Sequence, residues 1–213
     1  MRCKPLTETS AKKTDPEGRE RLVSAYEWRG HAVEVCDSAR NVLSIIRMFD
    51  GGTADVGERL LGMLFLDPMA LPVADDEELQ ALVYDAMWDV CGLDVTPDGR
   101  FVQDDDERWF DWDEDADRIR NSLRAAYGIC WDDVSDSMTF SEASSLITQL
   151  AEYGVETPFQ QAVHYRLAKP PSAKEVGQRA VDAFYEMRDF YELKDSGGSF
   201  GDQGDVDAMF EAA

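Results

Sequence analysis

The sequence predicts a mainly α-helical fold, a compact helical domain of about six or seven amphipathic helices with a short N-terminal β-hairpin. Three observations favour this fold. Apolar residues recur at helical spacing along most of the chain. Capping motifs, in which Asp, Ser or Thr precedes Glu by three residues, open several of these segments. Only one short stretch alternates apolar and polar residues as a strand does.

The N-terminal region is expected to contain a mobile arm followed by a hairpin. Residues 1–22 are polar and show no periodicity, which is typical of a flexible segment. Apolar and polar residues alternate over 26–28 and 31–35, on either side of Arg29-Gly30. This pattern predicts two short strands, which need packing against helices to persist.

Three helices are expected between the hairpin and residue 92. Asp37 precedes the first apolar stripe, and Thr53 precedes the second, which stops before Pro68. Asp75 with Glu78 opens the third helix, which has the cleanest amphipathic pattern in the chain and ends at a glycine, residue 92. The following segment is rich in turn residues, and its acidic part, 98–107, is expected to be a loop.

Residues 111–166 predict three short helices with tight connections. Asp111 is the expected N-cap of the first helix, and Gly128 its left-handed C-terminal residue. Thr139 and Glu142 form a capping box for the second, which a glycine at 154 closes. Thr157-Pro158 supplies an N-cap and an N1 proline for the third. Each apolar stripe can be buried only against the others, so we expect these three helices to form a compact unit. We expect this unit to be part of one helical domain over 23–169, which includes the N-terminal hairpin.

The C-terminal part is expected to hold one helix and a tail. Pro170-Pro171 interrupt the chain, and Ser172 with Glu175 forms a third capping box. The pattern predicts a single helix over 172–194 that either docks on the domain or waits for a partner. Residues 195–213 are rich in Gly, Ser and Asp and are expected to form a flexible acidic tail.

Charge is the most extreme global feature of the sequence. The chain has 44 acidic and 21 basic residues, a formal net charge of −23. Such a charge repels nucleic acid and anionic membranes and favours a basic partner, although it also suits any highly soluble protein.

The four cysteines of the chain are far apart, and residues 1–21 contain no apolar signal segment. We therefore expect free thiols and an intracellular location.

The sequence offers little material for catalysis, a metal or a cofactor. It has two histidines and none of the common nucleotide-binding or hydrolase motifs. Alternate aspartates at 111–117 imitate half of a calcium loop, but Ala116 replaces the turn glycine and Ser122 the bidentate glutamate. We expect a non-enzyme. A buried contacting pair among four residues would change this expectation: Asp132, Asp136, His164 and Arg166.

Aromatic residues crowd the segment from 109 to 165 and allow two interpretations. They are the core of a small helical unit, or some of them line a groove for a hydrophobic helix of another protein. The candidate partner-binding residues are six of these aromatics and the neighbouring arginine: Trp109, Trp112, Tyr127, Trp131, Tyr153, Tyr165 and Arg166.

The same segment carries a resemblance to a known family. Its pattern includes Asp111-Trp112, Asp115-Ala116 and Ile119, then Ala125-Ala126-Tyr127-Gly128-Ile129 with Trp131, and further on Phe140, Leu150, Thr157 and Tyr165-Arg166. This resembles the "gene product fifteen" family, a tail-assembly family of phages and prophages of Gram-positive bacteria. The likeness covers about 26–166.

The resemblance implies a tail assembly chaperone in the cytoplasm of the bacterial host cell. Such a protein is encoded between the major tail protein and the tape measure protein of a long-tailed phage. It is thought to coat the hydrophobic, helical tape measure protein until tail tube subunits polymerise around it. The implied partners are therefore the tape measure protein and the major tail protein, with no nucleic acid and no membrane; self-association is left open.

The charge supports an alternative from a different class, an acidic DNA mimic that inhibits a host nuclease or restriction system. This function requires carboxylates spaced like phosphates along one surface. The acidic residues instead cluster at helix starts and in one loop, so we rank this alternative second.

Overall fold

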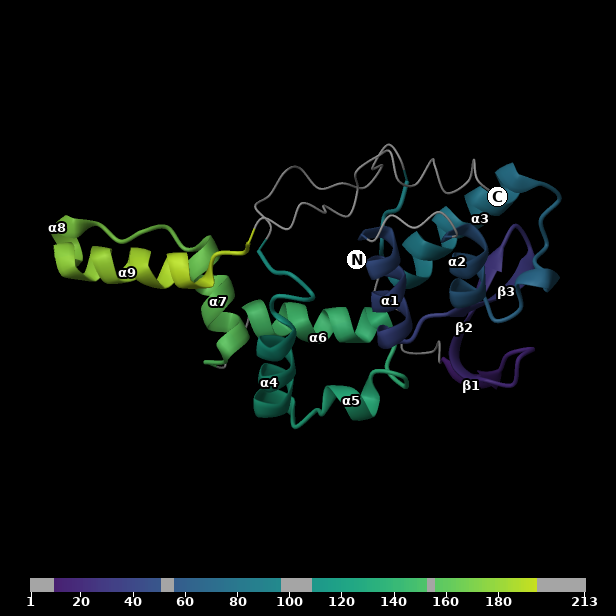
Figure 1. The fold of residues 1–213 in the computed structure, drawn as a ribbon, viewed down its shortest axis with the longest axis horizontal. Coiled ribbons are helices and arrows are strands. Elements are labelled where there is room, and N and C mark those ends of the chain that lie inside the picture. The colour runs from purple at the N-terminus through teal and green to yellow at the C-terminus, as the bar shows by residue number, and fades with distance from the viewer. Residues whose placement is uncertain (1–9, 51–55, 97–108, 153–155, 195–213) are drawn as a thin grey trace. The chain divides into compact units, whose positions relative to one another are not determined.

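The computed structural model describes residues 10–50, 56–96, 109–152 and 156–194. It confirms a mainly helical fold with a small antiparallel sheet near the N-terminus (Figure 1). The described residues hold nine α-helices, more than predicted, because two of them are single turns. The chain divides into two compact units, one comprising Met1–Gln103, Asp133–Ala143 and Gly197–Ala213, the other Asp104–Asp132 and Ser144–Ser196.

The sheet of the first unit has the strand order β1-β2-β3, with β1 at Ala11–Thr14, β2 at Glu20–Trp28 and β3 at His31–Cys36. The predicted hairpin is confirmed as β2 and β3, and its turn places Arg29 and Gly30 at φ 49° and 83°. These left-handed angles match the right-handed twist of the strands in a two-residue hairpin.

The structure corrects part of the predicted mobile arm. Of residues 1–22, the segment from 11 to 14 forms β1, which pairs with β2, and β2 already begins at Glu20. The pattern AKKT gave no signal because all four residues of β1 are exposed. Lysines are common on such edge strands, where they discourage pairing with other chains. Residues 1–9 lie outside the described part of the chain.

Asp15 builds the turn between β1 and β2. Its Oδ1 accepts hydrogen bonds from the backbone N–H groups of Glu17 (3.0 Å) and Arg19 (2.8 Å), and the Arg19 guanidinium donates to Oδ2 at 2.7 Å. Burial alone would raise the pKa of Asp15, but these donors outweigh it and hold that pKa below its ordinary value.

The helices of the first unit follow the sheet in sequence. They are α1 (Ala39–Asp50), α2 (Val56–Leu64), the 3₁₀ turn η1 (Pro68–Ala70), α3 (Asp76–Ala86) and the π-helical turn η2 (Met87–Cys91). Asp75 caps α3 as predicted, since its Oδ1 accepts the Glu78 N–H at 2.9 Å. Gly92 ends the segment at φ 71°. The predicted helix start at Thr53 and the loop 98–107 lie outside the described residues.

The core of the first unit joins the hairpin to these helices. Its largest fully buried side chains include Val35, Ile45, Leu60, Phe65 and Leu82. Two hydrogen bonds extend this packing at the surface of α3 and η2. Trp28 Nε1 donates to Asp85 at 3.0 Å, and the Tyr26 hydroxyl donates to Asp89 at 3.0 Å.

The second unit contains α4 (Ala116–Tyr127), α7 (Pro158–Leu167), α8 (Ala173–Val176) and α9 (Gln178–Tyr191); α5 (Trp131–Val134) and α6 (Phe140–Glu152) cross the sequence boundary between the units. The capping box of α6 is confirmed by hydrogen bonds in both directions between Thr139 and Glu142. The cap of α7 is confirmed by the Gln160 N–H, which donates to Thr157 Oγ1 at 3.2 Å. The expected end of α6 at 154 is not among the described residues.

Two helix boundaries differ from the prediction. Asp111 is not the N-cap of α4; its Oδ1 accepts N–H groups of Asp113 (2.8 Å) and Glu114 (2.7 Å) in a preceding turn, and the helix begins at Ala116. The single helix expected over 172–194 is broken at Gly177 into α8 and α9. Gly177 has φ 83° and ψ 156°, an extended conformation that ends one helix and, without a Cβ, is accessible mainly to glycine.

The core of the second unit brings α4, α6 and α7 together. Its buried members are Ile119, Leu123, Ile147, Leu150, Phe159 and Val163. A polar contact joins two of these helices, since the Phe159 N–H donates to the buried Ser122 Oγ of α4 at 3.1 Å. This hydrogen bond satisfies one of the free N–H groups in the first turn of α7.

Candidate partner-binding surface

Three of the predicted partner-binding aromatics pack against the core of the second unit. Trp109, Trp112 and Trp131 are partly buried on the core cluster of α4, α6 and α7. Phe110 links them, because its ring centroid lies 4.4 Å from that of Trp109 and 5.1 Å from that of Trp112. This placement favours the interpretation of these tryptophans as core residues.

Arg166 is buried and holds four parts of the second unit together. Its guanidinium donates to both carboxylate oxygens of Asp115, at 2.6 Å and 3.0 Å. Its Nε donates to the Tyr191 carbonyl at 2.6 Å, and its Nη1 to the Trp109 carbonyl at 3.1 Å. Arg166 of α7 thereby fixes the start of α4, the segment before it and the end of α9.

Asp115 is the anion at this junction. Its side chain is fully buried, and Arg118 also donates to its Oδ1 at 2.7 Å. Burial favours the neutral acid and would raise the pKa of Asp115. The hydrogen bonds from Arg166 and Arg118 favour the carboxylate more strongly and hold this pKa below its ordinary value. The aspartate that imitated a calcium ligand in the sequence thus pairs with two arginines.

This lowered pKa predicts an acid-sensitive second unit. The carboxylate of Asp115 stabilises the fold above the ordinary aspartate pKa, and this stability is lost as the pH falls through the lower pKa of the folded state. We expect the urea midpoint of the wild type to fall at acidic pH more steeply than that of Asp115→Asn. The check is a set of urea titrations between neutral and acidic pH; equal slopes would contradict the prediction.

Tyr165 connects α7 to α9 through stacked rings. Its ring lies 5.7 Å from that of Tyr191 at an interplanar angle of 11°, and 5.6 Å from that of Phe184. The Tyr191 hydroxyl also lies 3.4 Å from the Gln161 side chain of α7. α9 is therefore attached mainly through Phe184 and Tyr191, toward its C-terminal end (Figure 1).

The remaining apolar surface of α9 is open. Phe190 is 68% exposed and Tyr185 46%, while Val181 and Met187 are half-buried. At 100° per residue, the apolar side chains of α9 span well over half of its circumference, whereas the contact with α7 uses a narrow strip. A helix that is apolar on so much of its surface is normally covered by other protein.

The other two candidates have different positions. Tyr127, at the end of α4, is 40% exposed. Tyr153 lies outside the described residues. The predicted tryptophans thus pack against the core of the second unit, and Arg166 forms an ion pair inside it. α9 carries exposed aromatic side chains.

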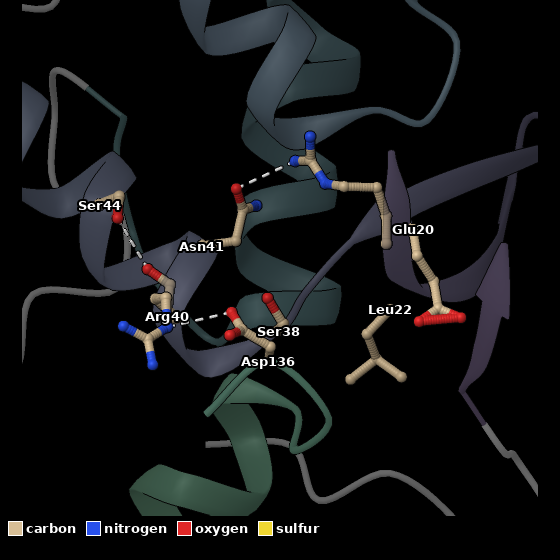
Figure 2. A pocket seen from close by; sticks show the side chains of 8 residues that line it. Glu20, Leu22, Ser38, Arg40, Asn41, Ser44 and Asp136 are labelled. Atoms are coloured by element: carbon tan, nitrogen blue, oxygen red, sulfur yellow. Dashed lines mark hydrogen bonds and ion pairs between the residues drawn. The ribbon is translucent and has the colours of Figure 1, made fainter. Parts of the chain in front are cut away.

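The first unit has a polar cleft of about 210 Å³ (Figure 2). It is lined by β2, α1 and the loop before α6: Glu20, Arg21, Leu22, Ser38, Arg40, Asn41, Ser44 and Asp136. Arg21 donates to Asn41 Oδ1 at 3.0 Å, and Arg40 pairs with Asp136 at 3.1 Å. Both guanidinium groups of the cleft thus have partners in the chain. The Arg40–Asp136 ion pair is exposed and contributes little stability.

The residues that would indicate an enzyme do not form a buried pair. Asp132 and His164 are exposed, Asp136 pairs with Arg40, and Arg166 pairs with Asp115. Among the described residues, no three His, Cys, Asp or Glu side chains are grouped so that they could hold a metal ion. Within the described ranges, no helix is both long and apolar enough to cross a membrane.

The chain matches the family model described as "Bacteriophage Gp15 protein" over residues 19–193. The chain belongs to this bacteriophage Gp15 family. The match begins just before β2 and runs through the end of α9, so it includes residues of both units. Searches of curated proteins and of solved structures found no match to this chain.

Two features that matter for binding do not follow from the predictions made from sequence. Phe190 and Tyr185 are not among the predicted binding residues, although the width of the apolar arc of α9 is visible in the sequence. Asp115 is one of four alternate aspartates between 111 and 117. No sequence signal distinguished it, because its partner Arg166 lies 51 residues away.

The cysteines of the chain allow a simple check of the first unit. Cys36 is buried, and burial raises the pKa of its thiol to about 11, so its reactive thiolate is scarce near neutral pH. Cys91 is also buried, whereas Cys130 is partly exposed. We expect iodoacetamide to label Cys130 quickly in the native protein and Cys36 and Cys91 only after unfolding. Peptide mass spectrometry measures this order, and rapid labelling of Cys36 would contradict the structure.

Proposed function

We propose that this phage protein is a tail assembly chaperone that binds the tape measure protein and tail tube subunits during tail formation. In this proposal it performs no reaction. Its family supports a phage role, and the open apolar surface of α9 is the single observation that supports binding of another protein.

The chemistry of α9 suits a helical partner. Tyr185 and Phe190 are exposed aromatics, and amphipathic helices commonly bind with such side chains at helical spacing. The acidic residues Asp182, Glu186 and Asp189 lie on the polar side of the same helix and are exposed. They would favour a partner whose apolar stripe is bordered by basic residues.

The net charge of −23 supports the shielding part of this function. When many copies of this acidic chain cover a hydrophobic protein, they give it a large negative charge. Proteins covered in this way repel one another, and this repulsion opposes their aggregation. The contact area of one short helix is small. Small contacts dissociate quickly, so tail tube subunits could displace each copy in turn.

Co-expression with the tape measure protein of the same phage tests the proposal. We expect the wild type to raise the soluble fraction of the tape measure protein and to co-purify with it. Tyr185→Asp and Phe190→Asp should reduce both effects, because each places a charge in the open apolar surface. Met69→Asp is the matched control, since Met69 is 94% exposed in the first unit. If the wild type gives no complex and no gain in solubility, the proposed function is wrong.

The DNA-mimic alternative receives less support. Asp15 and Asp115 are engaged by arginines, and Asp85 and Asp89 accept hydrogen bonds from Trp28 and Tyr26. Carboxylates held in this way cannot form part of a freely accessible track of charges. Inhibition of a DNA-binding enzyme by the protein at low salt would support this alternative.

A further inference from the structure

One side of α9 carries a seam with the spacing of a coiled coil. Ala180, Ala183, Met187 and Phe190 follow one another at intervals of three, four and three residues, which is the a/d pattern of a heptad repeat. Ala180, Ala183 and Phe190 are exposed and Met187 is half-buried. We call these four residues the α9 seam.

Contacts within the second unit leave Ala180, Ala183 and Phe190 of this seam exposed and cover Met187 only in part. The rings of Phe184 and Tyr191, at the neighbouring e positions, take the contact with Tyr165 of α7. On the other border of the seam are Arg179 and Glu186, both exposed. A helix approaching the seam would therefore meet α7 on one side and a charged, open border on the other.

We propose that α9 of a second copy of this chain covers the seam, and that the two α9 helices pair antiparallel about a two-fold axis near Tyr185. The proposal concerns the free protein and stands apart from the proposed function.

The sizes of the seam residues carry the choice of occupant and direction. Small residues lie at one end of the seam and large residues at the other. An antiparallel pair sets a positions against d positions of the partner helix, so Ala180 faces Phe190 and Ala183 faces Met187. Every layer then combines one small and one large side chain, and the helices keep a constant separation. A parallel pair would stack large residues on large ones and leave a gap between the alanines.

The charged border does not favour this arrangement. An antiparallel pair brings like borders together, and Glu186 lies one residue from the two-fold axis near Tyr185. The Glu186 side chains of the two copies therefore lie close to each other, and their repulsion weakens the pair. The seam is about 15 Å long, which is short for a stable interface, so we expect a weak dimer that forms as the concentration rises.

Sedimentation velocity of the full chain over a roughly hundredfold range of concentration tests the self-association. We expect the sedimentation coefficient to rise with concentration. Ala183→Glu should weaken the dimer at least about tenfold, because it buries a charge in the seam. Ala125→Glu is the matched control, as Ala125 is an exposed residue of α4, and it should leave the dimer unchanged.

Cysteine cross-linking tests the direction of the pair, in a background with Cys3 and Cys130 replaced by serine. A mixture of Ala180→Cys and Phe190→Cys should give mixed disulfide dimers, because these positions face each other and a disulfide needs Cα atoms within about 7 Å. Ala180→Cys alone should form no disulfide-linked dimer on oxidation.

Three results would overturn the proposal. One is a wild type that stays monomeric at all concentrations. The second is a dimer that Ala183→Glu and Ala125→Glu affect equally. The third is efficient cross-linking of Ala180→Cys to itself, which would indicate a parallel pair. Neither experiment includes the tape measure protein, so these results are separate from the co-expression test.

Discussion

Replacing Arg166 with methionine is expected to lower the free energy of unfolding by about 3 kcal/mol, the range for removing one partner of a buried ion pair. The change leaves the fully buried carboxylate of Asp115 without its two hydrogen bonds from Arg166. It also frees the Tyr191 carbonyl, so the end of α9 loses its anchor to α7. Urea denaturation measures the loss, and hydrogen exchange of α9 reports the local loosening.

Two variants make this prediction specific. Arg118→Met removes a partly exposed donor to the same carboxylate, and we expect it to cost only about 1 kcal/mol. The double variant Arg166→Met with Asp115→Leu replaces the pair by apolar groups and should recover much of the stability. A double variant less stable than Arg166→Met would show that Asp115 is not left as an uncompensated charge.

Phe159→Ala is expected to destabilise the protein by about 3–5 kcal/mol. Phe159 is fully buried in the core of the second unit, and its ring centroid lies 6.2 Å from that of Trp109 and 6.1 Å from that of Phe110. Removing the ring leaves a cavity that these neighbouring rings can fill only in part. Urea unfolding, followed by tryptophan fluorescence, measures the change.

Phe190→Ala is the matched control for this prediction. It makes the same substitution in the same unit at a side chain that is 68% exposed, so we expect a change within about 0.5 kcal/mol. Similar losses for the two variants would mean that α9 is covered in the free chain at low concentration, contrary to the structure.

The parts of the fold that were predicted correctly depend on neighbours in sequence. The capping residues Asp75, Thr139 and Thr157 act on backbone groups three residues away, so their roles are visible in the sequence. The Arg29-Gly30 turn is equally local, because its left-handed angles require a residue such as glycine. These signals sufficed to locate most helices and the hairpin.

The predictions that failed depend on partners far along the chain or on a choice between two local solutions. β1 has no apolar alternation of its own and exists because it pairs with β2. A helix does begin after Ser172, although the Ser172 side chain makes no capping hydrogen bond, and Gly177 ends this helix after one turn by taking an extended conformation. Asp111 and Asp115 are equivalent by local rules, and only the pairing of Asp115 with Arg166 separates them.

The candidate site shows the same division. The sequence placed most of the aromatics in one segment but could not tell core from surface, because a tryptophan is amphipathic and packs well in either place. The structure puts Trp109, Trp112 and Trp131 against the core and leaves Tyr185 and Phe190 of α9 open.

The sequence by itself determined the helical class, the hairpin, the capped helix starts and the family, because these follow from periodicity, short-range hydrogen bonds and residue pattern. Only the tertiary structure decided which charges pair inside the second unit and which apolar residues remain uncovered. Burial and ion pairing join residues such as Asp115 and Arg166 across 51 positions, and no local pattern specifies such a contact.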